Sequence, residues 1–108
     1  MPVFAVPLAA EKLDPWKSWL DELKGPRKAA YDDMNARLGL TTHEAYLQQA
    51  PDGNFLVIVV QDGPGGDSFA EKLLASDNEF DRWFATNIAD LHGIDPTGPL
   101  PPAPERYL

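Results

Sequence analysis

The sequence predicts an α+β fold in which helices cover one face of a single antiparallel sheet. Two apolar runs, at 3–6 and 55–60, are typical of strands, and two longer stretches carry apolar residues at helical spacing. Their order is strand, broken helix, hairpin and helix, which is most of the β-α-β-β-α-β plan of ferredoxin-like domains. With 108 residues, the chain is expected to form one domain over 1–95, followed by an arm over 96–108.

A first strand and a pair of helices are expected in the first half of the chain. The run 3–6 ends at Pro7, which lacks the N–H group that a strand ladder needs. Asp14 is expected to cap a helix, and Gly25-Pro26 separates it from a second helix that begins at the proline. The apolar side of this helix pair consists of Leu13, Trp16, Trp19, Leu20 and Leu23, then Ala30, Tyr31, Met34 and Leu38.

A β-hairpin is expected next. Residues 41–49 have a mixed pattern, and the turn sequence Pro51-Asp52-Gly53-Asn54 joins them to the unbroken apolar run 55–60. Because that run is apolar at every position, both of its faces must be covered, whereas the helices cover only one. Exposing the other face would leave a large apolar patch, so the sequence predicts a homodimer.

Two further helices are expected after a loop at 61–66. Asp67 is expected to cap the shorter helix. Ser76 and Glu79 have the capping-box spacing that opens the longer one, which ends near His92. The longer helix carries an apolar stripe formed by Phe80, Trp83, Phe84, Ile88 and Leu91.

The arm at 96–108 is rich in proline, which excludes a regular helix or a central strand there. The fourth strand of the ferredoxin-like plan falls in this stretch. That edge of the sheet is therefore either empty or taken by the arm. The tip of the arm, Tyr107-Leu108, is apolar, and it is expected to dock across the dimer.

Composition excludes several classes of function. The chain has 9 Lys and Arg against 17 Asp and Glu, and its net charge of -8 is the wrong sign for binding nucleic acid. No apolar run approaches the ~18 residues of a membrane span, and the start lacks the basic segment of a secretory signal. We therefore expect a cytoplasmic protein with no membrane partner.

The sequence also predicts no metal and no other cofactor. There is no cysteine, which excludes disulfides, thiolate nucleophiles and cysteine-ligated metal, and only two histidines are present. The glycine-rich segment Gly63-Pro64-Gly65-Gly66 is interpreted as a plain loop. Asp62 and Asp67 flank it, and these carboxylates would repel the phosphate that such loops bind.

Several short segments carry a family resemblance. They are Val3-Phe4-Ala5-Val6-Pro7, Gly25-Pro26-Arg27, Leu47-Gln48-Gln49, Phe80-Asp81-Arg82-Trp83-Phe84 and His92-Gly93-Ile94-Asp95. With them the chain resembles the dimeric α/β-barrel superfamily, and especially a bacterial group of small proteins of about this length. That superfamily includes antibiotic-biosynthesis and haem-degrading monooxygenases and stress-responsive proteins. The resemblance implies that two sheets pack together in a dimer.

The two histidines are candidate ligand-binding residues. His92 lies near a helix C-terminus, where the helix dipole favours an imidazolium cap. Alternatively, it borders a pocket between helix and sheet. The resemblance to haem-degrading enzymes, which use a helix histidine in that cleft, would then make it an axial haem ligand or a general base. His43 and its neighbour Glu44 are expected on a strand, so they point to opposite faces.

Five more residues are candidates because of their positions. Asn87 falls in the middle of the apolar stripe, so its amide either bonds the backbone of the sheet or faces a ligand. Arg27 lies on the apolar stripe of the second helix, at the helix start, from which its side chain can reach solvent. Trp16 and Trp83 are expected in the core or at the border of a cleft. Tyr46 lies on a polar strand face, in solvent or inside a barrel.

Two functions fit these observations. The first is binding of a small, mostly apolar molecule in a helix–sheet cleft, and the resemblance adds a cofactor-independent oxygenase or isomerase activity. The second is a non-catalytic dimerisation or stress-response module whose aromatic residues only pack. A cleft of ~300 Å³ or more, lined by tryptophan and reached by His92, Asn87 or Tyr46, would favour the first.

Overall fold

The computed structural model describes residues 3–94 and 107–108. It is an α+β structure with a three-stranded antiparallel sheet in the order β1-β3-β2. The strands are β1 (Val3–Leu8), β2 (Thr42–Gln49) and β3 (Phe55–Asp62). Both outer strands pair with the central strand β3: β2 along its whole length, and β1 along residues 55–60. The predicted hairpin and the predicted α+β class are confirmed.

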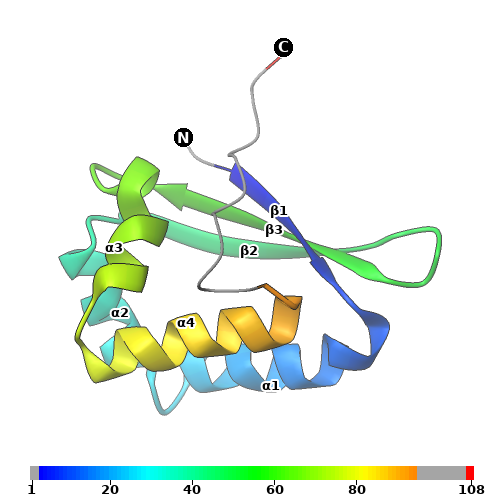
Figure 1. Cartoon of the computed structure of the whole chain (residues 1–108), viewed down its shortest axis with the longest axis horizontal. Helices are drawn as coiled ribbons and strands as arrows, with labels where there is room; N and C mark the ends of the chain where they lie inside the picture. Colours follow the sequence, from blue (N-terminus) through cyan, green and yellow to red (C-terminus); the bar gives the residue numbers. More distant parts are fainter. Residues whose placement is uncertain (1–2, 95–106) are drawn as a thin grey trace.

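The helices lie together on one side of this sheet, and α1 and α4 run side by side (Figure 1). Most of the buried apolar residues belong to these helices and to the sheet face that they cover. The order of these strands and helices, and their arrangement in two layers, are compatible with the ferredoxin-like plan. The helical segments are α1 (Leu13–Lys24), α2 (Lys28–Arg37), α3 (Phe69–Ala75) and α4 (Glu79–His92), with short 3₁₀ turns η1 (Ala10–Lys12) and η2 (Gly66–Ser68).

Two predicted strands, β1 and β3, end later in the structure than the sequence predicted. The first strand does not stop at Pro7 but continues to Leu8. Because β1 is an edge strand, it pairs on one side only, and a proline without an N–H group is tolerated there. The central strand also runs beyond the predicted apolar segment, through Gln61 to Asp62. Gln61 thus belongs to the sheet and not to a loop.

The helix boundaries differ from the predictions in their capping residues. Asp14 lies inside the first turn of α1, and Asp67 lies inside η2, so neither caps a helix. The N-cap of α4 is Asn78, whose Oδ1 accepts hydrogen bonds from two backbone N–H groups of the first turn. Ser76 lies two residues too early for that role and binds the carboxylate of Asp81 instead. The second helix begins at Lys28, two residues after the proline.

The glycine-rich loop packs tightly against the turn between α2 and β2. The Gly65 N–H donates to the Gly39 carbonyl oxygen at 2.9 Å, and Gly66 N–H donates to Gly63. A Cβ at Gly65 would collide with the Leu38 carbonyl oxygen. These N–H groups are used within the chain, so they form no cradle for phosphate.

The opposite face of the sheet carries no helix in the described part of the chain. Along β3 it presents Leu56, Ile58 and Val60, and Leu56 is 38% exposed. Residues 96–106 of the predicted arm (96–108) lie outside the described residues. Tyr107 and Leu108 are exposed on the single chain. None of the helices in the described ranges combines the length and apolar character that a membrane span requires.

Candidate functional site

A cavity of about 430 Å³ lies between the helix-covered face of the sheet and the helices α1, α3 and α4. This volume falls within the range of about 300–1,000 Å³ that is usual for small-molecule sites. Its walls are mostly apolar, and seven aromatic rings contribute to them: Phe4, Trp16, Trp19, Tyr31, His43, Phe69 and Phe84. The cavity is larger than the ~300 Å³ that would favour ligand binding over a solid core, and its wall contains Trp16, Trp19 and His92.

His43 is the centre of a polar cluster in the wall of this cavity. It projects from β2, and α2 supplies two of its partners, Asn35 and Tyr31. The His43 Nδ1 lies 2.9 Å from Asn35 Oδ1, so Nδ1 carries the proton and donates it to the amide oxygen. The ring also stacks on Tyr31, with 5.6 Å between centroids.

The fourth member of this cluster is Gln61 on β3. Its Nε2 lies 3.3 Å from His43 Nε2 and donates to the lone pair on that nitrogen. The strand register explains the contact, because His43 and Gln61 are directly opposite partners in the β2–β3 ladder and therefore share one face. Both ring nitrogens of His43 are thus engaged by neutral amides.

Burial keeps this cluster uncharged. Desolvation by burial lowers the pKa of His43 to about 4. Burial also raises the pKa of Tyr31, against the opposing effect of its hydrogen bond with Asn35. His43 and Tyr31 are therefore neutral at pH 7, and the Tyr31 hydroxyl donates to the His43 carbonyl oxygen.

His92 lines the same cavity from the last turn of α4. Its Nδ1 lies 2.9 Å from the carbonyl oxygen of Pro7 on β1, so Nδ1 is protonated and Nε2 holds the lone pair. Desolvation lowers the pKa of His92, and the hydrogen bond to Pro7 opposes this only in part. The predicted imidazolium cap is wrong, because Nδ1 donates to β1 and not to the end of the helix, and burial disfavours the charged ring.

The seven predicted candidates divide into two groups. His43, His92 and Trp16 line the cavity. The other four are not among the described residues of its wall: Arg27, Tyr46, Trp83 and Asn87. Asn87 does not bond the sheet, because its Nδ2 donates to the Trp83 carbonyl oxygen one turn earlier in its own helix.

The three remaining residues lie on other surfaces. Arg27 reaches solvent as expected, but its guanidinium also stacks 4.2 Å over the ring of Trp83 and pairs with Glu22. Tyr46 is 54% exposed on the uncovered face of the sheet, where its hydroxyl donates to Glu44. Trp83 is half-buried, and its ring contacts Arg27, Phe80 and Trp19.

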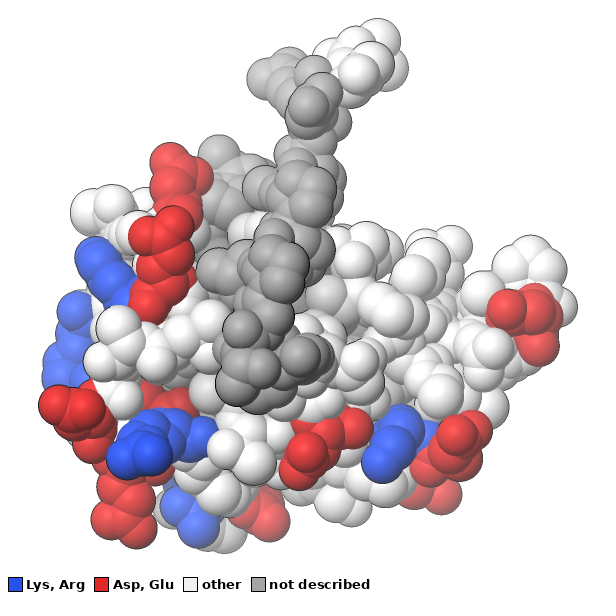
Figure 2. Space-filling view, viewed as in Figure 1, with Lys and Arg blue, Asp and Glu red and all other residues white. Residues whose placement is uncertain are grey.

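The charge of the cavity wall is negative. Figure 2 shows acidic side chains over α3, and Asp67 and Glu71 belong to the wall from that side. No Lys or Arg lines the cavity within the described ranges. A haem carries two carboxylates and would lack cationic partners here, so the wall does not fit the haem that the resemblance implies for His92. Among residues 3–94 and 107–108 no cluster of His, Asp and Glu could hold a metal ion.

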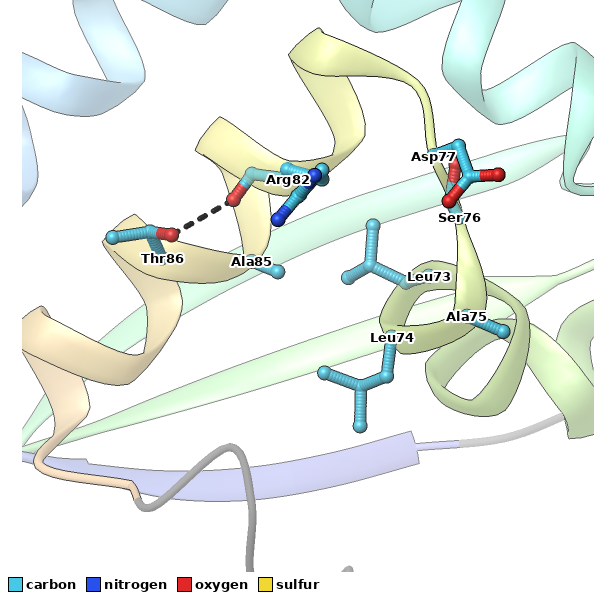
Figure 3. Close-up of a pocket in the computed structure, with 8 residues that line it drawn as sticks. All are labelled: Leu73, Leu74, Ala75, Ser76, Asp77, Arg82, Ala85 and Thr86. Atoms are coloured by element: carbon cyan, nitrogen blue, oxygen red, sulfur yellow. Dashed lines mark hydrogen bonds between the residues drawn. The ribbon is translucent and has the colours of Figure 1, made fainter.

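A second hollow of about 320 Å³ lies between α3 and α4 (Figure 3). Two of its polar side chains, Ser76 and Thr86, are used by the chain itself. Thr86 Oγ1 donates to the Arg82 carbonyl oxygen at 2.9 Å, and Ser76 binds Asp81. Apolar contributions come only from leucine and alanine side chains. Because its described wall contains no aromatic ring, we place the candidate site in the larger cavity.

Sequence reasoning missed Tyr31, Asn35 and Gln61. Tyr31 was assigned to the apolar stripe of α2. Asn35 lies four residues later on the same helix face, and this spacing could have identified it as an inward residue beside Tyr31. Gln61 continues the alternation of Val57 and Val59 along β3, which could have identified it as an inward residue.

Comparisons with known proteins give no relative: no family model matches the chain, no curated protein is similar to it, and no solved structure matches its fold at a significant level.

Proposed function

We propose that this chain binds a small, mostly apolar molecule in the cavity between the helices and the sheet. The observation that carries the proposal is the cavity of about 430 Å³, which has seven aromatic rings and only a few polar groups in its wall. Ligand sites in proteins have this composition, because apolar walls supply affinity and a few polar groups fix orientation. A domain whose aromatic residues only pack would fill this space with side chains.

Filling the cavity tests this proposal. Ala70 lies in the wall on α3, and replacing it with phenylalanine places a ring in the cavity, whereas Ala36→Phe adds the same ring to the exposed side of α2. We expect Nile red, an uncharged fluorescent probe, to bind the wild type and Ala36→Phe saturably, with at least about tenfold weaker binding to Ala70→Phe. Circular dichroism checks that both variants fold. No saturable binding to the wild type would refute the proposal.

A catalytic role for His92 extends this proposal to an isomerase or a cofactor-independent oxygenase. Such reactions need a base that removes a proton from the substrate. The support is the hydrogen bond to Pro7, which fixes the His92 ring and leaves the Nε2 lone pair free at the cavity wall. His43 is less suited to this task, since Gln61 already occupies its Nε2.

Proton exchange tests the catalytic role. A molecule extracted from the purified protein and returned to it in deuterated water is expected to gain deuterium at carbon, and His92→Phe is expected to stop this gain while Nile red still binds. If the wild type leaves the carbon-bound protons unexchanged, the chain is a binding protein without this chemistry.

We also propose that a second copy of the chain covers the free face of the sheet. The support is an apolar row in which Ala5, Ile58 and Tyr46 are directly opposite one another across the three strands. Light scattering at micromolar concentration is expected to give a dimer, and Ile58→Glu is expected to give a monomer. Gln48→Glu, on the same face at the hairpin end, serves as the control. A monomeric wild type would exclude this arrangement.

A further inference from the structure

Gln61 leaves one strong hydrogen-bond acceptor open in the cavity. Its side chain lies on the helix-covered face with Val57 and Val59, and the residue is only 9% exposed. Its Nε2 is used by His43, but no described residue donates to its Oε1. That oxygen is also not sealed off from open space, in contrast to Trp19 Nε1. A nearly buried amide oxygen without a partner is costly unless a bound group or water donates to it.

The neighbouring groups cannot donate to that oxygen. Within the cluster, the His43 Nδ1 proton goes to Asn35, and the Tyr31 hydroxyl proton goes to the His43 carbonyl oxygen. His43 Nε2 carries no proton, and burial keeps it so at neutral pH. The protons of His43 and Tyr31 are therefore used within the cluster, and the Gln61 Oε1 acceptor stays open to a ligand.

The charge around the cavity points in the same direction. Asp67 on η2 and Glu71 on α3 lie in the wall, and the described wall holds no Lys or Arg. A ligand carboxylate would lose its hydration without gaining a cation from this wall. An aromatic molecule, by contrast, meets rings on several sides, which favours stacked and edge-to-face contacts.

From these observations we infer that the ligand is an aromatic molecule without negative charge that donates an O–H or N–H hydrogen bond to Gln61 Oε1. This inference rests on the ligand cavity proposed above and specifies what that cavity selects. Gln61 is then the residue that distinguishes hydroxyl-bearing or amine-bearing aromatics from their ethers and acids. Only a ligand with an O–H or N–H group can pair the Gln61 Oε1 acceptor, so such a ligand binds more tightly than one without a donor.

Three probes with the same ring system test it on the wild-type protein. At pH 7, 2-naphthol is neutral and donates a hydrogen bond, 2-methoxynaphthalene has no donor, and 2-naphthoate is anionic. Affinities can be measured from quenching of tryptophan fluorescence, because Trp16 and Trp19 lie in the cavity wall. We expect 2-naphthol to bind at least about tenfold more tightly than each of the other two.

A pair of glutamine variants assigns the selectivity to one residue. Gln61→Leu removes the acceptor, so the preference for 2-naphthol over 2-methoxynaphthalene is expected to fall to about twofold or less. Gln48→Leu makes the same change on the exposed face of β2 and is expected to keep the wild-type preference. A preference that survives in a folded Gln61→Leu variant would overturn the role of Gln61.

The outcomes separate this inference from the proposed function. If none of the three naphthalenes binds the wild type and Nile red also fails, the cavity is not a ligand site. If 2-methoxynaphthalene or 2-naphthoate binds as tightly as 2-naphthol, the cavity binds ligands, but the inferred selectivity is wrong.

Discussion

Two polar clusters lie inside this chain, and they differ in charge and in how completely their atoms are paired. The first joins Arg37 on α2 to Asp81 on α4, which is fully buried. The second joins Asn35 on the same helix to His43 and Gln61 on the sheet. In the first, both carboxylate oxygens receive hydrogen bonds from the guanidinium, at 2.8 and 2.9 Å. In the second, all groups are neutral and one amide oxygen stays open.

This difference teaches where to look for function in the fold. The Asp81 carboxylate also accepts from Ser76 at 2.7 Å, and Arg37 Nε donates to Asp33. Such a saturated network has no capacity left for a ligand, so its role is to hold α2 against the start of α4. The His43 cluster lies at a cavity and keeps an acceptor free, which a purely structural cluster has no reason to do.

Breaking the saturated cluster is expected to give the largest effect. Arg37→Ala leaves the buried Asp81 carboxylate without its cation, and we expect the free energy of unfolding to fall by about 3 kcal/mol in urea titrations. This is the low end of the range for buried pairs, because the Arg37 side chain is 35% exposed.

The matched control removes the exposed partner of the same guanidinium. Asp33→Asn is expected to cost less than about 0.5 kcal/mol, since that pair lies largely in solvent. Equal losses in the two variants would show that the buried ion pair does not stabilise the fold more than the exposed one.

The two clusters are expected to respond to different pH ranges. The pKa of His43 is lowered to about 4, so between pH 6.5 and 4 the unfolded chain binds more protons than the folded one. Stability therefore falls as the pH decreases through this range, by about 2 kcal/mol between pH 7 and pH 5. The hydrogen bond with Arg37 lowers the pKa of Asp81 below 3.8, so that contribution is lost only in more acidic solution.

A variant without the imidazole isolates the first range. His43→Phe is expected to have a smaller loss of stability between pH 7 and pH 5 in urea titrations, because phenylalanine does not titrate. The loss is measured for each protein relative to its own free energy of unfolding at pH 7. An unchanged pH profile would mean that His43 is not the group that titrates.

The sequence predicted the elements well wherever the signal was local. The residues that predict the apolar stripe of α4 and the hairpin turn before Phe55 lie close together in the sequence. Both features are found in the structure. Caps were less well predicted, since Ser76 and Asn78 are both good capping residues and only the backbone geometry at Asn78 decides between them.

The site was predicted only in part, because its residues lie far apart in the sequence. His43, His92 and Trp16 were identified as candidates and line the cavity. The partners of His43 lie on another helix and on another strand, and the strand register that brings Gln61 opposite it is a tertiary property. Gln61 also follows the apolar run of β3, so a pattern of apolar residues alone ended the strand too early.

Within the two clusters, the smallest stability effect is expected at Gln61, where function and not folding depends on the side chain. Gln61→Leu loses the bond to His43 but also removes an unpaired acceptor, so the free energy of unfolding should stay within about 1 kcal/mol of the wild type. In the saturated cluster, Ser76→Ala removes a hydrogen bond to a charged group and should cost about 1.5–2 kcal/mol. Urea titrations of both variants, with Ser18→Ala on the exposed side of α1 as reference, measure the difference. A larger loss for Gln61→Leu than for Ser76→Ala would mean that the His43 cluster is structural as well.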